Sequence, residues 1–269
     1  MVTNSVPLGR PFWTFWSAAA LANVGDGIRL AAFPLLAASL TTSPVGVAAV
    51  TAGQALPWLV TGLLAGSLAD RRGARTLLAQ ADVARVIVLV VLVVAVALGW
   101  ASLPLVLLAS FLLGVGETVR DTAAQTALPC LVPDRLLERA NGRLATGEIV
   151  GNEFVGPPVG AALFVVGAAL PFAANGASLA LAVMLVLTLP LSLAARPPLV
   201  STTQVSQGVV AGLRWLVRHR VLRVLVVVTA AVAAADSAWF AILVLYATNR
   251  LGPVCQGELG PAAYSKSAG

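Results

Sequence analysis

Charged residues are scarce in this sequence. They make up 10% of its 269 residues, whereas soluble domains carry about a quarter. Histidine occurs once and cysteine twice, and the sequence contains no His-Glu-x-x-His, phosphate-loop or Gly-x-Ser-x-Gly pattern. These shortages exclude a soluble globular domain and give no indication of an enzyme, a metal site or a cofactor.

Lysine is also nearly missing, since Lys266 is the single lysine among 17 basic residues. A retinal protein needs a lysine in its seventh helix to form a Schiff base. We expect Lys266 to lie outside the membrane, which argues against that class. Cys130 and Cys255 are expected on opposite sides of the membrane, so we predict no disulfide between them.

Long apolar runs dominate the chain instead. Hydrophobic residues make up 59% of the sequence, and its mean hydropathy is +0.92. A helix rises about 1.5 Å per residue, so it needs about 20 apolar residues to cross a membrane. Seven runs reach this length, and none alternates with the period of a β-strand. They lie near residues 12–40, 45–69, 76–98, 103–126, 141–167, 170–195 and 222–249. The sequence therefore predicts an all-α integral membrane protein.

Arginine in the connections sets the expected orientation. The loops after the second, fourth and sixth runs contain arginines, whereas the tight turns at 41–44, 99–102 and 167–171 contain none. Because basic residues collect in cytoplasmic loops, we expect the N-terminus in the cytoplasm. The net charge of +6 then matches anionic lipid headgroups, and we predict no nucleic-acid partner.

Two runs carry opposite charges three residues apart, a spacing that places both charges on one helix face. Asp26 and Arg29 form such a pair near the middle of the first run. It is either a buried pair that holds this helix against its neighbours or a protonatable aspartate in a transport path. Asp82 and Arg85 repeat the spacing in the third run, near its cytoplasmic end, where we expect contact with water and headgroups and a structural role.

The fourth run ends with three charges in five residues: Glu117, Arg120 and Asp121. Arg120 stays protonated, so it must meet an anion. Glu117 has the spacing of a partner for Arg120, whereas Asp121 is too close in sequence to share its face. We expect a cytoplasmic gating network here, with direct substrate contact as the alternative.

Carboxylates also interrupt the fifth and seventh runs. Glu148 is assigned to the ion-pair network. Glu153 is expected near the membrane midplane, where it either exchanges protons or serves as a hydrogen-bonded structural group. Asp236 is either bonded to the first helix or to Ser237, or it is a further coupling carboxylate. The segment 156–160 that follows Glu153 contains glycine and proline, which permit a kink and close backbone approach.

The hairpin between the second and third runs follows the pattern Gly-x-x-x-Asp-Arg-x-Gly-x-Arg. Its residues are Gly66, Asp70, Arg71, Gly73 and Arg75, with Ala74 where a basic residue is usual. This pattern resembles the loop between helices 2 and 3 of the major facilitator superfamily. The resemblance implies a cytoplasmic latch at Asp70 that meets helix 11. The seven apolar runs of this sequence do not extend to a helix 11, so we expect Asp70 to contact only local arginines or water.

Residues 133–141, together with the segment Gly25, Asp26 and Gly27, extend the resemblance to residues 12–250. Gly156, Pro157 and Gly160 resemble the antiporter motif that is associated with export, although Asn152 stands where a glycine is expected and Ala161 replaces the final glycine. Residues 133–141 resemble the loop between helices 4 and 5 of an efflux branch that includes siderophore exporters and macrolide pumps.

The resemblance implies a domain organisation. We expect the N-terminal six-helix half of a major facilitator fold at 1–195 and a cytoplasmic linker with an amphipathic interfacial helix at 196–221. A seventh transmembrane helix would occupy 222–250 and a polar tail 251–269. Alternating access needs two halves, so we expect a chain truncated after helix 7. The alternatives are a partner that supplies the second half and another copy of this chain.

The resemblance also implies a function. We expect a proton-coupled exporter of a hydrophobic drug-like or siderophore-like small molecule in the bacterial cytoplasmic membrane, with membrane lipids, protons and the substrate as partners. Asp26 and Glu153 are the first candidates for coupling, and Asp236 is the third. The alternative is a non-transporting, truncated or regulatory membrane protein derived from such a transporter.

Overall fold

The computed structural model describes residues 8–189, 219–221, 223–224, 227–228 and 231–232, and within 59–72 it describes the backbone alone. The chain divides into two units, Met1–Ser201 and Thr202–Gly269. In the second unit, the described residues from Arg220 onward are helical. Asp236 and most of the expected amphipathic helix lie outside the described residues.

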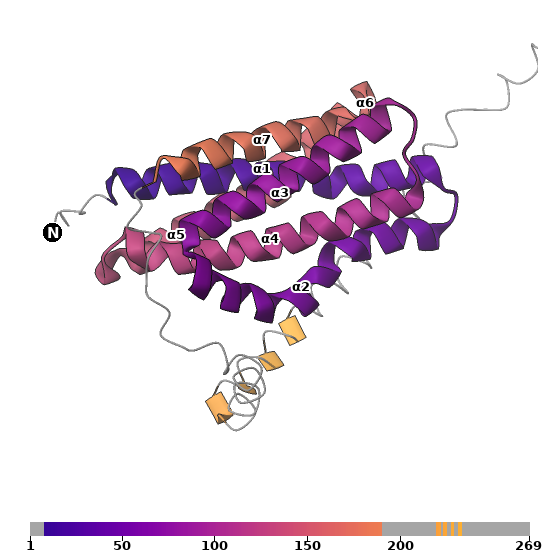
Figure 1. Ribbon diagram of the computed structural model, residues 1–269. Helices are drawn as coiled ribbons and strands as arrows, with labels where there is room; N and C mark the ends of the chain where they lie inside the picture. The colour runs from indigo at the N-terminus through magenta and orange to yellow at the C-terminus, as the bar shows by residue number, and fades with distance from the viewer. Residues whose placement is uncertain (1–7, 190–218, 222, 225–226, 229–230, 233–269) are drawn as a thin grey trace, which may run out of the picture. The chain divides into compact units, whose positions relative to one another are not determined.

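The first unit is built from helices, and no strand occurs in its described part (Figure 1). The helices are α1 (Gly9–Leu40), α2 (Pro44–Arg72), α3 (Ala74–Ala97), α4 (Leu103–Leu131), α5 (Leu137–Ile149), α6 (Gly156–Val166) and α7 (Leu170–Leu187). A short 3-10 turn, η1 (Asp134–Leu136), precedes α5, and a π-helical segment, η2 (Val150–Val155), joins α5 to α6. The fifth apolar run is thus one helix with a π turn in its middle.

The helices follow the apolar runs because each run is long enough to cross the membrane. Five described segments have this length and apolarity: α1, α3, α4, the segment Asp134–Val166 and α7. The fourth run was expected to end at 126, but α4 continues to Leu131. Pro129 lies in its last turn, where its missing N–H removes one hydrogen bond near a helix end that already lacks several.

The packing places α1 and α4 at the centre of the unit. The α1 helix packs against α7, α6, η2 and α5, while α4 packs against α2 and α3, and α3 also contacts α7. Aromatic side chains fill the α1–α7 contact, where the rings of Phe33 and Phe172 lie 5.1 Å apart in an edge-to-face arrangement. This arrangement leaves the outer faces of α3 and α7 without helical neighbours.

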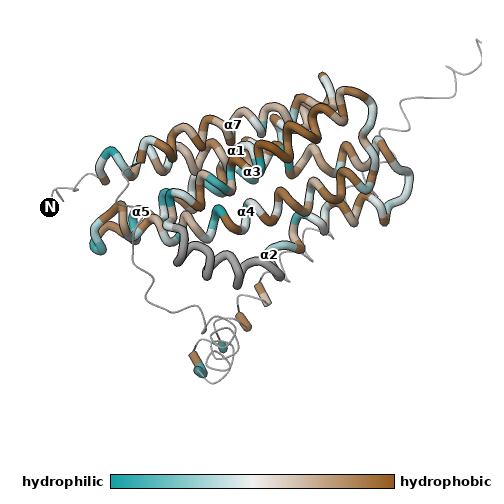
Figure 2. The backbone as a smooth tube through the Cα atoms, viewed as in Figure 1, coloured by the Kyte–Doolittle hydropathy of each residue, from teal (hydrophilic) through white to brown (hydrophobic). Residues whose placement is uncertain are grey.

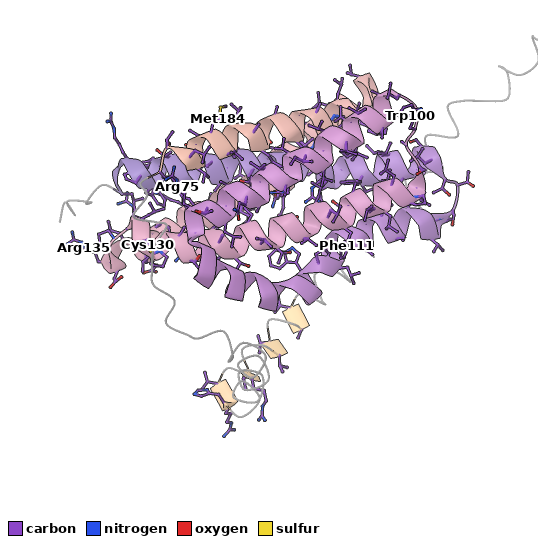
Figure 3. All side chains as sticks on the ribbon, in the orientation of Figure 1. Arg75, Trp100, Phe111, Cys130, Arg135 and Met184 are labelled. Atoms are coloured by element: carbon purple, nitrogen blue, oxygen red, sulfur yellow. The ribbon has the colours of Figure 1, made fainter. Side chains whose placement is uncertain are left out.

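Those outer faces are apolar (Figure 2). Ile87, Val90 and Val91 on α3 are each more than half exposed, and so is Met184 on α7. Apolar side chains on the outside of a bundle are expected where lipid tails surround the protein. Figure 3 shows Cys130 and Arg135 at one end of the bundle and Trp100 at the other. The α4–α5 connection, which carries arginine, thus lies at the end opposite the α3–α4 turn.

Glycines allow η2 and α6 to approach α1 closely. A Cβ atom built on Gly27 would lie 2.5 Å from the Gly151 carbonyl oxygen and 2.9 Å from the Asn152 carbonyl oxygen, and one built on Gly160 would collide with the Ile28 carbonyl oxygen. Any larger residue at these positions would push the two backbones apart. Four glycines of this segment face α1: Gly147, Gly151, Gly156 and Gly160.

The π turn keeps these four glycines on one face. Their spacings are four, five and four residues, and the five-residue step spans η2. Pro157 and Pro158 have no backbone N–H, so the carbonyls of Glu153 and Phe154 lose their usual donors. The Gly156 N–H donates to the carbonyl of Gly151, five residues earlier. This is the hydrogen-bond spacing of a π-helix. The π turn accommodates the extra residue, so that Gly156 still faces Gly27 on α1.

Candidate functional site

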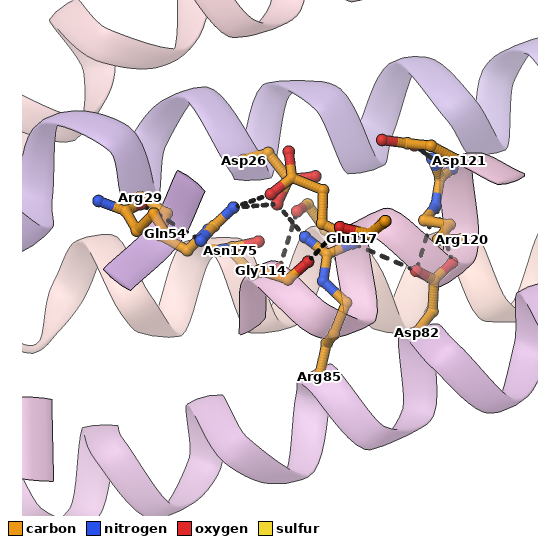
Figure 4. A network of polar contacts seen from close by, with 12 residues as sticks. Asp26, Arg29, Gln54, Asp82, Arg85, Gly114, Glu117, Arg120, Asp121 and Asn175 are labelled. Carbon is orange, nitrogen blue, oxygen red and sulfur yellow. Dashed lines mark hydrogen bonds and ion pairs between the residues drawn. The ribbon is translucent and has the colours of Figure 1, made fainter. Parts of the chain in front are cut away.

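Buried charges from α1, α3 and α4 meet inside the first unit (Figure 4). Asp26, Arg29, Asp82, Arg85 and Arg120 are all at most 3% exposed. Charged side chains in membrane-spanning helices are costly unless they pair with one another or line a cavity. The contacts of the three arginines show how this cost is met.

Arg29 connects α1 with α2 and α4. Its Nη2 donates to Glu117 Oε2 at 2.6 Å and lies 3.5 Å from Asp26 Oδ1, and its Nη1 donates to Gln54 Oε1 at 3.2 Å. The expected pair between Asp26 and Arg29 is confirmed. The strongest contact of Arg29, however, is to Glu117 on another helix, as expected for a charge-assisted hydrogen bond of this length.

Arg85 connects α3 with α1. Its Nη2 donates to Asp26 Oδ1, and its Nη1 lies 3.4 Å from Asp82 Oδ1. The expectation that Asp82 and Arg85 are solvated at the cytoplasmic end is wrong, because both are almost fully buried. Helix position alone suggested headgroup contact, but the face that carries this pair turns toward α1 and α4.

Arg120 is paired differently from the sequence-based expectation. Its Nε donates to Asp82 Oδ2 at 3.2 Å, its Nη2 donates to the Ala18 carbonyl at 3.3 Å, and its Nη1 lies 3.6 Å from Asp121 Oδ1. The expected pairing with Glu117 is wrong because Glu117 binds Arg29. Asp121, which was expected to lie too close in sequence to share a face with Arg120, still contacts it, because the long arginine side chain reaches its neighbour.

The network holds more negative than positive groups. Three arginines face four carboxylates, of which Asp121 is the most exposed, with 32% of its side chain accessible. Each arginine contacts at least two carboxylates. Loss of one carboxylate charge therefore changes the pairing of arginines on several helices at once.

Glycines on α4 make room for this network. A Cβ atom built on Gly116 would lie 2.5 Å from Arg85 Cγ, and one built on Gly114 would lie 2.6 Å from the Gln54 carbonyl oxygen. The Arg85 stem passes over α4 at Gly116 and so reaches Asp26. In the sequence Gly114-Val115-Gly116-Glu117, the two glycines thus let Gln54 and Arg85 approach α4 closely. The glutamate that follows them supplies the carboxylate that binds Arg29.

The remaining predicted residues fall into two groups. Glu148 and Glu153 are exposed on α5 and η2, and none of the ion pairs between described residues includes either of them. The structure therefore does not bring Glu148 into the network. Asp236 lies outside the described residues. Gly66, Asp70 and Arg71 are described by their backbone alone, so the expected contacts of Asp70 stay a prediction.

The end of the hairpin is described. Gly73 has φ +73° and ψ 135°, a left-handed backbone that favours glycine, and it turns the chain from α2 into α3. Arg75 then donates through Nη2 to the Leu187 carbonyl at the end of α7. The pattern residues Gly73 and Arg75 therefore fasten the α2–α3 connection to a helix more than 100 residues further along the chain.

The sequence led to a wrong position for two members of the network, and a third was not predicted at all. Asp82 and Arg85 were noted but assigned to the membrane surface, although intramembrane charges at i and i+3 were the same signal that identified Asp26 and Arg29. Gln54 was not singled out, and a polar residue in an apolar helix was its available signal. Among the described residues, no group of three or more His, Cys, Asp or Glu side chains could hold a metal ion.

Membrane-length helices around a buried charge network, with an arginine-anchored hairpin, define a multi-pass membrane protein. The chain belongs to the transmembrane secretion effector family of the major facilitator superfamily, whose family model matches residues 3–257. No curated protein matches the chain.

Proposed function

We propose that this transporter exports a hydrophobic drug-like or siderophore-like small molecule in exchange for protons. The observation that carries the proposal is the position of Asp26, whose Oδ1 atom is shared by Arg29 of its own helix and Arg85 of α3. An intramembrane carboxylate held by two arginines on different helices is a natural place to couple protonation to helix movement.

Protonation of Asp26 would remove the negative charge that Arg29 and Arg85 share. Arg29 would then rely on Glu117 and Arg85 on Asp82, since these are their other carboxylate contacts. The contact between α1 and α3 would weaken, while the contacts of α1 with α4 would remain. One proton thus changes which helices are tied together, as a coupled transporter requires.

Glu153 is the second proposed coupling group, because it is an exposed carboxylate in a helix of the bundle. It lies in a π turn, a feature that is frequent at functional sites. The resemblance of Gly156, Pro157 and Gly160 to the antiporter motif supports export. We further propose Asp236 as a third coupling group, and a location in the bacterial cytoplasmic membrane with the N-terminus inside.

The test uses everted membrane vesicles that contain the intact transporter. A fluorescent hydrophobic dye and an iron-chelating catecholate represent the two substrate classes, and an imposed proton gradient drives their uptake. We expect the wild type to accumulate at least one of them and the double variant Asp26→Asn, Glu153→Gln to lose this uptake. Unchanged uptake by the double variant would show that the coupling assignment is wrong.

Two matched controls separate coupling from a general loss of carboxylates. Asp134 in η1 and Glu138 at the start of α5 are exposed and belong to no ion pair between described residues. Asp134→Asn and Glu138→Gln should retain uptake. If these controls lose uptake as fully as the double variant, the effect has no connection with the proposed coupling groups.

A further inference from the structure

Asn175 on α7 is a buried amide without an assigned partner. Its exposed fraction is 0%, and neither its Oδ1 nor its Nδ2 atom has a hydrogen-bond partner among the described residues. An asparagine side chain can accept two hydrogen bonds and donate two. Buried polar groups are nearly always hydrogen-bonded, and leaving them unpaired is costly. The position of this amide shows what can bind it.

The amide lies at the junction of α1, α3 and α7. A Cβ atom built on Gly25 would lie 2.5 Å from Asn175 Oδ1, so the amide occupies the space beside Gly25 on α1. The adjacent Gly176 faces Leu89 on α3, with a built Cβ 3.7 Å from Leu89 Cβ. Leu89 is one helical turn beyond Arg85, and Gly25 precedes Asp26. Figure 4 draws Asn175 together with Asp26 and Arg29.

The ion pair at this junction also has unused hydrogen-bonding capacity. The Nε atoms of Arg29 and Arg85 are buried and have no partner among the described residues. Both arginines contact the same oxygen of Asp26, Oδ1, which leaves Oδ2 able to accept a hydrogen bond. The junction thus contains free donors on Arg29, Arg85 and Asn175, together with free acceptors on Asn175 and Asp26.

This mixture of donors and acceptors selects the ligand. A metal cation would face the guanidinium of Arg85, and an anion would face the carboxylate of Asp26. A water molecule both donates and accepts, and buried water typically makes about three hydrogen bonds to polar groups of this kind. Ser178 Oγ lies beside the same glycine as the amide oxygen, since a Cβ atom built on Gly25 would collide with both.

We propose that Asn175, Asp26 and Arg85 form an internal hydration site that holds an ordered water molecule. The water links α7 to the charge network, a connection that no direct side-chain contact between described residues provides. The site does not depend on which carboxylate couples transport to protons. It gives Asn175 a role in binding water rather than in packing alone.

The test compares Asn175→Leu with the wild type in the purified full chain. Leucine has the same branched shape as asparagine but no polar atom, so it cannot bind water. If the amide were simply unpaired, removing it would relieve a desolvation cost and raise the Tm. If it holds water, the substitution deprives Asp26 and Arg85 of a partner, and we expect the Tm to fall by about 2–4 °C. Leu179→Met, at a buried position one turn further along α7, controls for repacking and should change the Tm less.

Infrared spectroscopy supplies the second measurement. Exchange into water labelled with the heavy oxygen isotope should shift an internal-water O–H band in the wild type and in Asn175→Ser, which retains a polar group. The band should be missing in Asn175→Leu. An unchanged or raised Tm in Asn175→Leu overturns the proposal. If that variant does not fold, a band that is absent from the wild type or from Asn175→Ser overturns it equally.

Discussion

Replacement of Arg85 by leucine tests whether the charge network holds the helices together. The substitution leaves Asp26 with Arg29 at 3.5 Å and Asp82 with Arg120 at 3.1 Å. Removing one partner of a buried ion pair costs about 3–5 kcal/mol when the remaining charge has no other partner. Because both carboxylates keep an arginine, we expect a smaller loss of about 2–3 kcal/mol.

This loss is measurable as a shift in melting temperature. At about 2–4 °C per kcal/mol for a unit of this size, Arg85→Leu should lower the Tm by about 4–12 °C. Thermal unfolding in detergent can be followed by tryptophan fluorescence, since the chain contains six tryptophans. Ile87→Leu serves as the control, because Ile87 lies two residues further along α3 and is 59% exposed.

A double-mutant cycle makes the prediction specific to the ion pair. Asp26→Leu combined with Arg85→Leu removes one charge of each sign and leaves Arg29 with Glu117 at 2.6 Å and Asp82 with Arg120. The double variant should therefore be more stable than the sum of the single losses predicts, by about 1–3 kcal/mol. Additive losses, or an Arg85→Leu shift no larger than that of Ile87→Leu, would refute the network as a source of stability.

Two further substitutions, each with a control variant, test the packing of the bundle. Gly160→Ala places a Cβ against the Ile28 carbonyl and should cost about 1–3 kcal/mol. Gly142→Ala places one in open space on α5 and should stabilise by about 0.5–1 kcal/mol; Tm shifts of the same sign in both variants would contradict the close α1–α6 contact. Arg75→Met removes the hydrogen bond to the Leu187 carbonyl and should cost about 1 kcal/mol in thermal unfolding. The exposed Arg135→Met should change nothing, and equal losses in both variants would show that the contact to α7 adds no stability.

The helices of the first unit could be predicted from the sequence because apolar length is a strong and local signal. The six predicted runs that begin between residues 12 and 170 correspond to helices or to the α5–η2–α6 segment. Most ends differ by a few residues, but the sixth run was expected to reach 195, whereas α7 ends at Leu187. The π turn at η2 was not predicted. The sequence shows Pro157 and Pro158, which indicate a kink, but the kind of kink depends on the backbone contacts with α1.

The charge network could be predicted only in part. Helical spacing correctly paired Asp26 with Arg29, which lie 3.5 Å apart on one helix. The same rule paired Arg120 with Glu117 incorrectly, because the actual partner, Asp82, comes from another helix. Spacing shows which residues share a face but not which face meets which neighbour. That choice depends on packing details such as Gly116, where a missing side chain lets Arg85 pass.

The π turn between Gly151 and Gly156 changes how the helix motif should be counted. Each residue of an α-helix turns by about 100°, so a pattern with fixed spacing places a glycine at position 152 and treats Asn152 as a departure. In three dimensions Gly151 takes that place on the face toward α1. In a sequence alignment the chain would therefore need a one-residue gap here rather than a substitution. Such an insertion leaves the contact with α1 unchanged. It changes the direction only of the side chains within the π turn, including that of Glu153.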